Sequence, residues 1–365
     1  MKKTNLLMVA FLAIGALTLA SCGDDDNTKG GGTETETVVT DGVYVLNEGS
    51  MYNKVPGTLN FYDNGSATST ANFFQKANGK ALGDTPNDAV INDEGEMYIA
   101  VSGENKVWVA DARTMKVKAE VNITYPREIA CDESNVYVSS WDGKVYKIDD
   151  KSHKVVSTSE KVGDCLEGLV VTGGHVYVCN ACNADYTTYY TNVVKLTTGL
   201  TKEKDITVAA NPNQIVTDGQ NMFVASWGNY MDVNATVQQI DLHTDQVTPI
   251  AEASKVALYA NRVYLVNAPY GKPATYSLYD LNSKKTTEWI KGTEIVSPYA
   301  MTVDPSNGDV YISSYGKDPA TGYASYTLNG YMARYKADGK FAGQFECGLN
   351  PGTILFLNHT EKNAF

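Results

Sequence analysis

A short apolar triplet with an aromatic residue at its centre recurs seven times along the chain, each time before a small or polar residue and a loop. The seven central residues are Tyr44, Tyr98, Tyr137, Tyr177, Phe223, Tyr264 and Tyr311. Neighbouring copies lie 39 to 54 residues apart, with a mean of about 44, which matches the repeat of a four-stranded propeller blade. The repeat predicts an all-β chain folded as a seven-bladed β-propeller of four-stranded blades.

A second repeated element precedes most triplets: a turn signal, then polar or small residues, then an apolar run. Its copies begin at Pro86, Pro126, Cys165, Pro212, Pro298 and Pro351, and 253–256 is a degenerate copy. Pro suits the first residue of a strand, where no ladder donor is needed, so these positions mark the innermost strands. The last copy has no triplet after it, and the first triplet has no such element before it. We expect the C-terminal strand to complete the N-terminal blade and close a propeller over residues 41–358.

The N-terminal segment carries targeting signals. Residues 1–21 have two lysines, an apolar run and small residues before Cys22, as in a signal peptide. The four residues ending at Cys22 resemble the bacterial lipobox, which implies lipid attachment to Cys22; a plain secretory peptide cut elsewhere is the alternative. The acidic cluster at 23–26 resembles a surface-export signal of lipoproteins from Gram-negative gut anaerobes, the alternative being a solvated acidic linker. We expect an outer-membrane, cell-surface lipoprotein with a flexible linker over 22–40 and a tail over 359–365.

Charge and motif content narrow the function. Thirty Lys and Arg residues against 42 Asp and Glu give a net charge of −12, which disfavours binding to nucleic acid. The chain has no nucleophile elbow, zinc-protease helix, phosphate loop or dinucleotide fingerprint. We therefore expect a binding protein and not an enzyme, with no catalytic residues, resident metal or cofactor.

Cysteine spacing predicts one disulfide. If Gly173 and Gly174 form a two-residue hairpin turn, the paired register places Cys165 opposite Cys182. The compartment expected for a secreted protein favours oxidation of such a pair. Cys131, Cys179 and Cys347 receive no role from the sequence.

The connections between the second and third strands of the blades are long and rich in aromatic residues. Solvated loops need no such rings for packing, so the rings indicate a binding surface, although they could also pack on each other. Polar groups at the starts of the inner strands should surround the channel mouth on the same face. The predicted ligand-binding residues are Tyr52, Asn87, Asp88, Arg127, Trp141, Asp142, Glu167, Tyr186, Trp227, Tyr230, Tyr270, Tyr299 and Tyr315.

Two other functions fit parts of this pattern. An oligosaccharide could stack on Trp141 and Trp227, as in a surface glycan-binding lipoprotein. A calcium-dependent, lactonase-like hydrolase could hold its cation with carboxylates and amides at the channel mouth, and the ligands would be Asp88, Glu128, Glu167 and Asn213.

The triplets and Pro starts over residues 42–358 resemble the YncE-like seven-bladed propeller family. The segments 43–49 and 57–63 are similar to the start of a group of surface propeller lipoproteins, the BtuG-like proteins of gut anaerobes. This resemblance implies capture of cobalamin or another corrinoid as a bound ligand and its transfer to a BtuB-like TonB-dependent transporter. A broad ring with an apolar face and a rim of amides would suit an aromatic face that surrounds polar groups.

Overall fold

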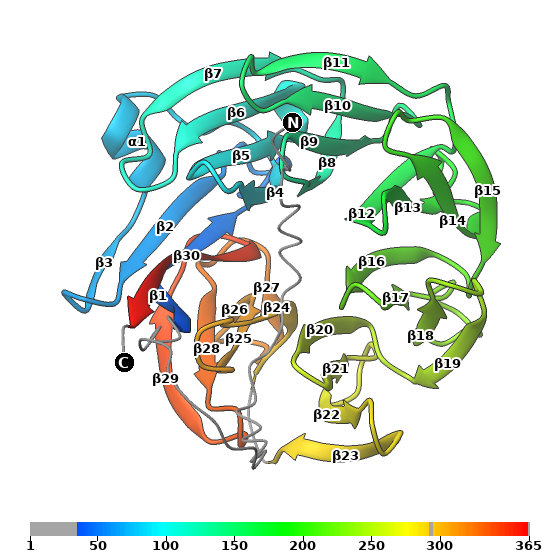
Figure 1. Ribbon diagram of the computed structural model, residues 1–365. Helices are drawn as coiled ribbons and strands as arrows, with labels where there is room; N and C mark the ends of the chain where they lie inside the picture. Colours follow the sequence, from blue (N-terminus) through cyan, green and yellow to red (C-terminus); the bar gives the residue numbers. More distant parts are fainter. Residues whose placement is uncertain (1–34, 292–294, 364–365) are drawn as a thin grey trace, which may run out of the picture.

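The computed structural model describes residues 35–291 and 295–363 of the chain. Within them, seven four-stranded antiparallel sheets stand around a central channel as the blades of a β-propeller (Figure 1). The predicted fold class and blade number are confirmed. The signal-peptide prediction, Cys22 and most of the predicted linker lie outside the described residues.

In each blade, the strands run from the innermost, at the channel, to the outermost. Blade 1 contains β30 (Pro351–Asn363), β1 (Thr35–Asn47), β2 (Thr58–Asp63) and β3 (Thr68–Thr70). Blade 2 contains β4 (Pro86–Ile91), β5 (Glu96–Val101), β6 (Lys106–Asp111) and β7 (Val117–Asn122). Blade 3 contains β8 (Pro126–Cys131), β9 (Asn135–Ser140), β10 (Val145–Asp149) and β11 (Lys154–Thr158). Blade 4 contains β12 (Cys165–Thr172), β13 (His175–Cys182), β14 (Tyr189–Thr197) and β15 (Lys202–Thr207).

The remaining blades follow the same order. Blade 5 contains β16 (Pro212–Thr217), β17 (Asn221–Ser226), β18 (Thr236–Asp241) and β19 (Val247–Ala251). Blade 6 contains β20 (Lys255–Tyr259), β21 (Arg262–Asn267), β22 (Thr275–Asp280) and β23 (Lys285–Ile290). Blade 7 contains β24 (Pro298–Val303), β25 (Val310–Ser314), β28 (Tyr331–Tyr335) and β29 (Phe341–Glu346). Outside the blades lie α1 (Phe73–Asn78), a 3-10 turn (Ser102–Glu104) and a small hairpin of β26 (Gly316–Lys317) and β27 (Ala324–Ser325).

Each triplet aromatic lies on the second strand of its blade and is almost completely buried, with at most 1% of its surface exposed. Several of these tyrosines also join neighbouring blades. The hydroxyls of Tyr98 and Tyr137 donate to the carbonyls of Asp150 (3.5 Å) and Thr198 (3.4 Å), which follow the third strand of the next blade. The hydroxyl of Tyr44 donates in the same way to the Ala112 carbonyl. The repeat therefore marks side chains that fill the space between blades, and three of them also bond their hydroxyl to the next blade.

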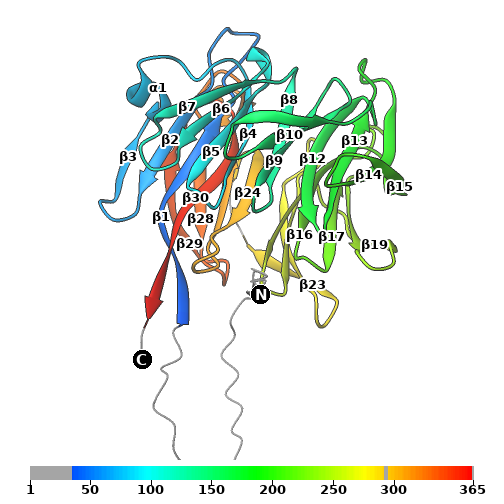
Figure 2. The same cartoon turned by 45° about the horizontal axis from the view of Figure 1, so that its top comes forward.

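The C-terminal strand closes the ring as predicted. The antiparallel ladder between β1 and β30 runs from Thr35 opposite Asn363 to Asn47 opposite Pro351. Its outer part projects from the propeller as a two-stranded ribbon (Figure 2). The prediction of a flexible linker through residue 40 and a free tail from residue 359 is therefore wrong for 35–40 and 359–363. Each segment satisfies the other's backbone groups, and the β-branched residues of 35–40 suit an extended strand.

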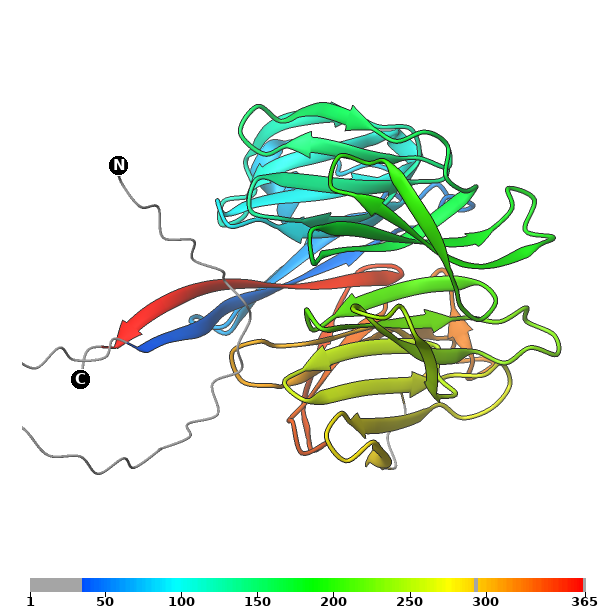
Figure 3. The same cartoon turned by 45° about the vertical axis from the view of Figure 1, so that its right-hand side comes forward.

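The two ends of the propeller differ. We call the loop face the end formed by the connections between second and third strands, at 48–57, 102–105, 141–144, 183–188, 227–235, 268–274 and 315–330, together with the crossings between blades. The opposite end, with short hairpin turns, is the turn face. The β1–β30 ribbon projects from the turn face, away from the long green loops that follow β13 and β17 (Figure 3). No helix in the described ranges is long and apolar enough to span a membrane.

Candidate functional site

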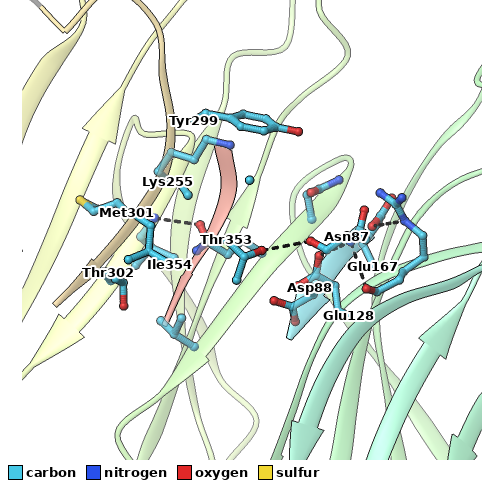
Figure 4. A pocket seen from close by; sticks show the side chains of 18 of the residues that line it. Asn87, Asp88, Glu128, Glu167, Lys255, Tyr299, Met301, Thr302, Thr353 and Ile354 are labelled. Atoms are coloured by element: carbon cyan, nitrogen blue, oxygen red, sulfur yellow. Dashed lines mark hydrogen bonds and ion pairs between the residues drawn. The ribbon is translucent and has the colours of Figure 1, made fainter. Parts of the chain in front are cut away.

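The inner strands enclose a cavity of about 430 Å³ in the central channel. Strands β4, β8, β12, β16, β20, β24 and β30 all begin at the loop face, so the first residues of each strand surround the mouth of this cavity. The charged and aromatic side chains that line it are Glu48, Asp88, Arg127, Glu128, Glu167, Trp227, Lys255 and Tyr299. Figure 4 shows this mixture of acids, a lysine and a tyrosine around one space. A water-filled channel alone has no need of so many ionisable groups.

One side of the cavity holds a closed ion pair. Glu167 of β12 accepts hydrogen bonds from Arg127 of β8, at 3.1 Å from Nε and 3.3 Å from the terminal nitrogen. The indole nitrogen of Trp141 donates to the same carboxylate at 2.9 Å, and the guanidinium lies 4.1 Å from the Trp141 ring. Burial lowers the pKa of Arg127, but Glu167 outweighs it, so the pKa ends above its ordinary value. This arrangement fixes both charges and uses the polar atom of Trp141.

A pair of acids lies on the inner strands of blades 2 and 3. Asp88 of β4 and Glu128 of β8 are hydrogen-bonded to each other, and Asn87 donates to Glu128 at 2.9 Å. Burial raises the pKa of Asp88 to about 6, although the backbone N–H of Ile129 donates to its carboxylate at 3.0 Å. Burial and then the Asp88 charge raise the pKa of Glu128 well above its ordinary value. The two acids therefore do not ionise as independent carboxyls, because burial and their mutual repulsion oppose a second negative charge.

The opposite wall carries a lysine between aromatic rings. The ammonium of Lys255, on β20, lies 4.6 Å from the ring centre of Trp227 and 5.4 Å from that of Tyr299. Tyr299 donates its hydroxyl to Glu48 at 2.6 Å, and burial raises the pKa of Glu48. Burial lowers the pKa of Lys255 to about 8, against the attraction of Glu48 and Glu128. Desolvation dominates here, which is typical of a charge that lacks a direct partner.

Around the channel mouth, the loop face exposes most of the protein's large apolar side chains. Among the described residues, twelve of the fifteen exposed ones lie on this face, so the distribution is not that of an ordinary surface. The face carries Met51, Tyr52, Val55, Tyr125, Tyr186, Tyr230, Met231, Val233, Tyr270, Tyr323, Tyr326 and Leu328. The other three, Val155, Val156 and Phe341, lie on outer strands.

Three of these aromatics have left-handed backbone conformations. Their φ angles are 40° at Tyr125, 56° at Tyr186 and 58° at Tyr230. A bulky residue is strained there by about 1–3 kcal/mol, and such strain is concentrated at functional sites.

The predicted site residues fall into three groups. Six line the cavity: Asn87, Asp88, Arg127, Glu167, Trp227 and Tyr299. Four are exposed on the surrounding face: Tyr52, Tyr186, Tyr230 and Tyr270. The other three, Trp141, Asp142 and Tyr315, lie behind the surface and hold other residues.

The third group makes contacts within the protein. Asp142 accepts a hydrogen bond from the Lys144 backbone at 3.0 Å and another from the Tyr146 hydroxyl, so it shapes its own loop. Tyr315 packs on Tyr299 with ring centres 4.6 Å apart. These contacts occupy the polar atoms or the ring faces that a ligand would use.

Two charged lining residues were missed by the sequence analysis. Glu48 follows the strand of the first triplet and enters the channel mouth only because the ring closes beside it. Lys255 begins β20 in the degenerate copy of the inner-strand element, where no Pro marks the strand start. Residues 253–254 stand where the other copies have the Pro that starts the strand. The position of Lys255 directly after them was the available signal.

The cysteine register is confirmed, whereas the disulfide is not formed in this structure. Cys165 pairs directly with Cys182 across β12 and β13, and both are free thiols. The two thiols are hydrogen-bonded to each other. Two register shifts lie between this pair and the hairpin turn, so the turn alone does not set the local register.

The calcium set considered from the sequence is not assembled. Over residues 35–291 and 295–363, no group of three or more His, Cys, Asp or Glu side chains is arranged to hold a metal ion. A reason is found at two of the expected ligands: Glu167 is bonded to Arg127, and burial beside Asp88 raises the pKa of Glu128, which disfavours its charged form.

Comparison with known proteins identifies a family and a fold. The family model described as "Domain of unknown function (DUF5074)" matches residues 41–333. No curated protein matches the sequence significantly. Hydrazine synthase of Kuenenia stuttgartiensis superposes with a TM-score of 0.61 at 16% identity, over 77% of this chain and 95% of that chain.

Two structures from Bacteroides species are also similar. A quinonprotein alcohol dehydrogenase-like protein of Bacteroides thetaiotaomicron gives a TM-score of 0.65 at 18% identity, over 87% of this chain and 78% of its own. A 6-phosphogluconolactonase candidate of Bacteroides uniformis gives 0.61 at 9% identity, over 87% of this chain and 100% of its own. At these identities the likeness extends to the propeller fold alone.

Proposed function

The chain belongs to the DUF5074 family, and on that premise we propose that it captures a large, partly apolar small molecule on the loop face of its propeller. The observation that carries this proposal is the gathering of exposed aromatic side chains around the polar mouth of the channel. Such a face offers stacking area and orienting hydrogen bonds together. We propose binding without catalysis, because the ionisable groups in the channel are engaged with one another or held by aromatic rings.

The area of the exposed rings indicates the size of the ligand. If Tyr52, Tyr186, Tyr230 and Tyr270 each lose about 100 Å² to the ligand, at ~25 cal/mol/Å², the gross gain is about 10 kcal/mol. That gain exceeds an association cost of several kcal/mol. Only a broad ligand covers rings from four different blades at once.

A corrinoid is our first candidate. Its broad ring has an apolar surface and a rim of amides, which matches exposed tyrosines surrounding channel-mouth groups such as Asn87 and Gln214. The glycan alternative is weaker because the two tryptophans on which it depended are engaged. Trp141 donates to Glu167, and Trp227 donates to the Ser254 carbonyl at 2.9 Å.

The setting that we propose is the outer surface of an outer membrane, with lipid on Cys22 as the anchor. Strand β1 enters the propeller through the ribbon on the turn face, so the chain that leads to Cys22 joins the end opposite the loop face (Figure 3). The loop face would then point away from the attachment point and toward incoming ligand. Delivery to a BtuB-like TonB-dependent transporter completes the proposal.

Calorimetric titration of the purified chain with cyanocobalamin tests it. We expect stoichiometric binding that weakens at least tenfold in both Tyr230→Ala and Tyr270→Ala. Phe341→Ala is the matched control, since Phe341 is also exposed but lies on the outer strand β29. Absence of heat at micromolar concentrations would exclude the corrinoid, and equal weakening by the Phe341 variant would exclude the loop face.

A further inference from the structure

The channel contains a cation without an anionic partner. Among the described residues, the Lys255 ammonium has no hydrogen bond or ion pair, and its contacts are the faces of Trp227 and Tyr299. The side chain lines the cavity beside Tyr299 (Figure 4). The other cation of the cavity, Arg127, is neutralised by Glu167 at 3.1 Å. The site thus presents one unused positive charge to whatever enters the channel.

Burial of this charge is unfavourable without a ligand. Desolvation lowers the pKa of Lys255 to about 8, and the nearest acids, Glu48 and Glu128, only partly offset this effect. A perturbed, unpaired group in a cleft is typical of a binding site. An anionic group that reached the ammonium would replace the interaction with water that the ammonium loses on burial.

The surrounding acids restrict the charge of that anion. Glu48, Asp88, Glu128 and Glu167 all line the cavity, against two basic groups. A second negative charge on the ligand would be repelled by these acids, so a monoanion is favoured over inorganic phosphate. Of the acids, Glu48 accepts a hydrogen bond from Tyr299, and burial raises the pKa of Asp88 and of Glu128, which reduces the repulsion of a single anion beside Lys255.

The deeper wall of the cavity includes apolar side chains beside Thr217 and Thr302. Val216, Leu258 and Met301 line it below the ring of charged groups. A cavity of about 430 Å³ lies within the range of small-molecule pockets and is too small for the broad ligand expected on the loop face. A short hydrocarbon chain would fill this part and displace water from it.

We propose that the central channel binds a small organic monocarboxylate, with its carboxylate against Lys255 between Trp227 and Tyr299 and its apolar tail along Val216, Leu258 and Met301. This site lies within the channel, and it does not depend on capture of a corrinoid by the loop face.

The test is a titration of the purified full chain with hexanoate, followed by protein NMR and by intrinsic tryptophan fluorescence. We expect saturable binding at one site that weakens at least tenfold in Lys255→Met. Lys147→Met is the matched control, because Lys147 also lies over a tyrosine, 5.5 Å from the Tyr137 ring centre, but is on β10, away from the channel. The neutral amide hexanamide should not bind measurably.

The pH dependence gives a second readout on the unaltered chain. Binding needs protonated Lys255, so affinity should fall between pH 7 and pH 9, as the pH rises through the pKa of about 8. Three titratable groups face Lys255: Glu48, Glu128 and Tyr299. As they lose protons with rising pH, they also weaken the binding of an anion. This pH dependence is measured on the unaltered chain, so it tests the proposal even if the Lys255 variant does not fold.

Four results would overturn the proposal: no hexanoate binding, equal binding by Lys255→Met, equal binding of hexanamide, or tighter binding of inorganic phosphate than of hexanoate. Cyanocobalamin titrations of the same samples separate the two proposals. Failure of corrinoid capture leaves the channel site standing, and failure of hexanoate binding leaves the loop-face proposal standing.

Discussion

Replacing Glu167 by Gln tests whether the charged channel mouth is organised as described. The variant keeps the size of the side chain and can still accept from Trp141, but it removes the charge that faces Arg127. The exposed fractions of the paired side chains are only 15% for Arg127 and 9% for Glu167. Breaking a buried pair by removing one partner costs about 3–5 kcal/mol.

Two nearby charges reduce this cost. Glu48 and Glu128 also attract Arg127. We therefore expect the lower end of the range, about 3 kcal/mol of lost unfolding free energy. In the exposed pair Lys340–Asp338, the variant Asp338→Asn should change stability far less, because solvent screens both charges.

The assay is equilibrium unfolding in urea, monitored by circular dichroism, for the unaltered chain and both variants. The double variant Arg127→Met with Glu167→Gln should recover part of the loss, because no unpaired charge remains. A loss below about 1 kcal/mol for Glu167→Gln would refute the conclusion that this pair is desolvated.

Three further predictions concern closure, protonation and redox state. Deleting residues 351–365 removes the inner strand of blade 1 and should abolish the cooperative thermal transition; an unchanged transition would contradict ring closure. Folding lowers the pKa of Lys255, so burial of its charge destabilises the folded chain. This loss of stability is fully present below pH 8 and fades toward pH 10.5. Lys255→Met should therefore stabilise the chain at pH 7 by up to about 3 kcal/mol and by little above pH 10; equal effects at both pH values in urea unfolding would be inconsistent with this reason. Cys165 and Cys182 should resist alkylation after mild oxidation, measured by mass spectrometry, and full alkylation of both would exclude the disulfide.

The fold was predictable because its packing is periodic in the sequence. The space between blades needs a large side chain at one position of each second strand, which makes Tyr98 and Tyr137 visible as a repeat. Inner strands were equally visible where Pro begins them, as at Pro86 and Pro212. The ribbon at 35–40 and 359–363 was missed because its two halves stabilise each other and neither half signals a strand alone.

The site was predictable only in part. Rings without packing partners, such as Tyr52 and Tyr270, were assigned correctly to an exposed face. Trp141 shares the same loop position but donates to Glu167, which lies in the next blade, and no local pattern reports that contact. Lys255 belongs to a degenerate copy, so its alignment with the channel depended on the three-dimensional arrangement of the blades.

A crystal structure of the chain with cyanocobalamin would test the central claim most directly. Our account predicts a corrin ring lying across the loop face, in contact with Tyr52, Tyr230 and Tyr270 and above the channel mouth. A ligand bound against the outer strands or on the turn face, or a loop face left empty at saturating ligand, would contradict it.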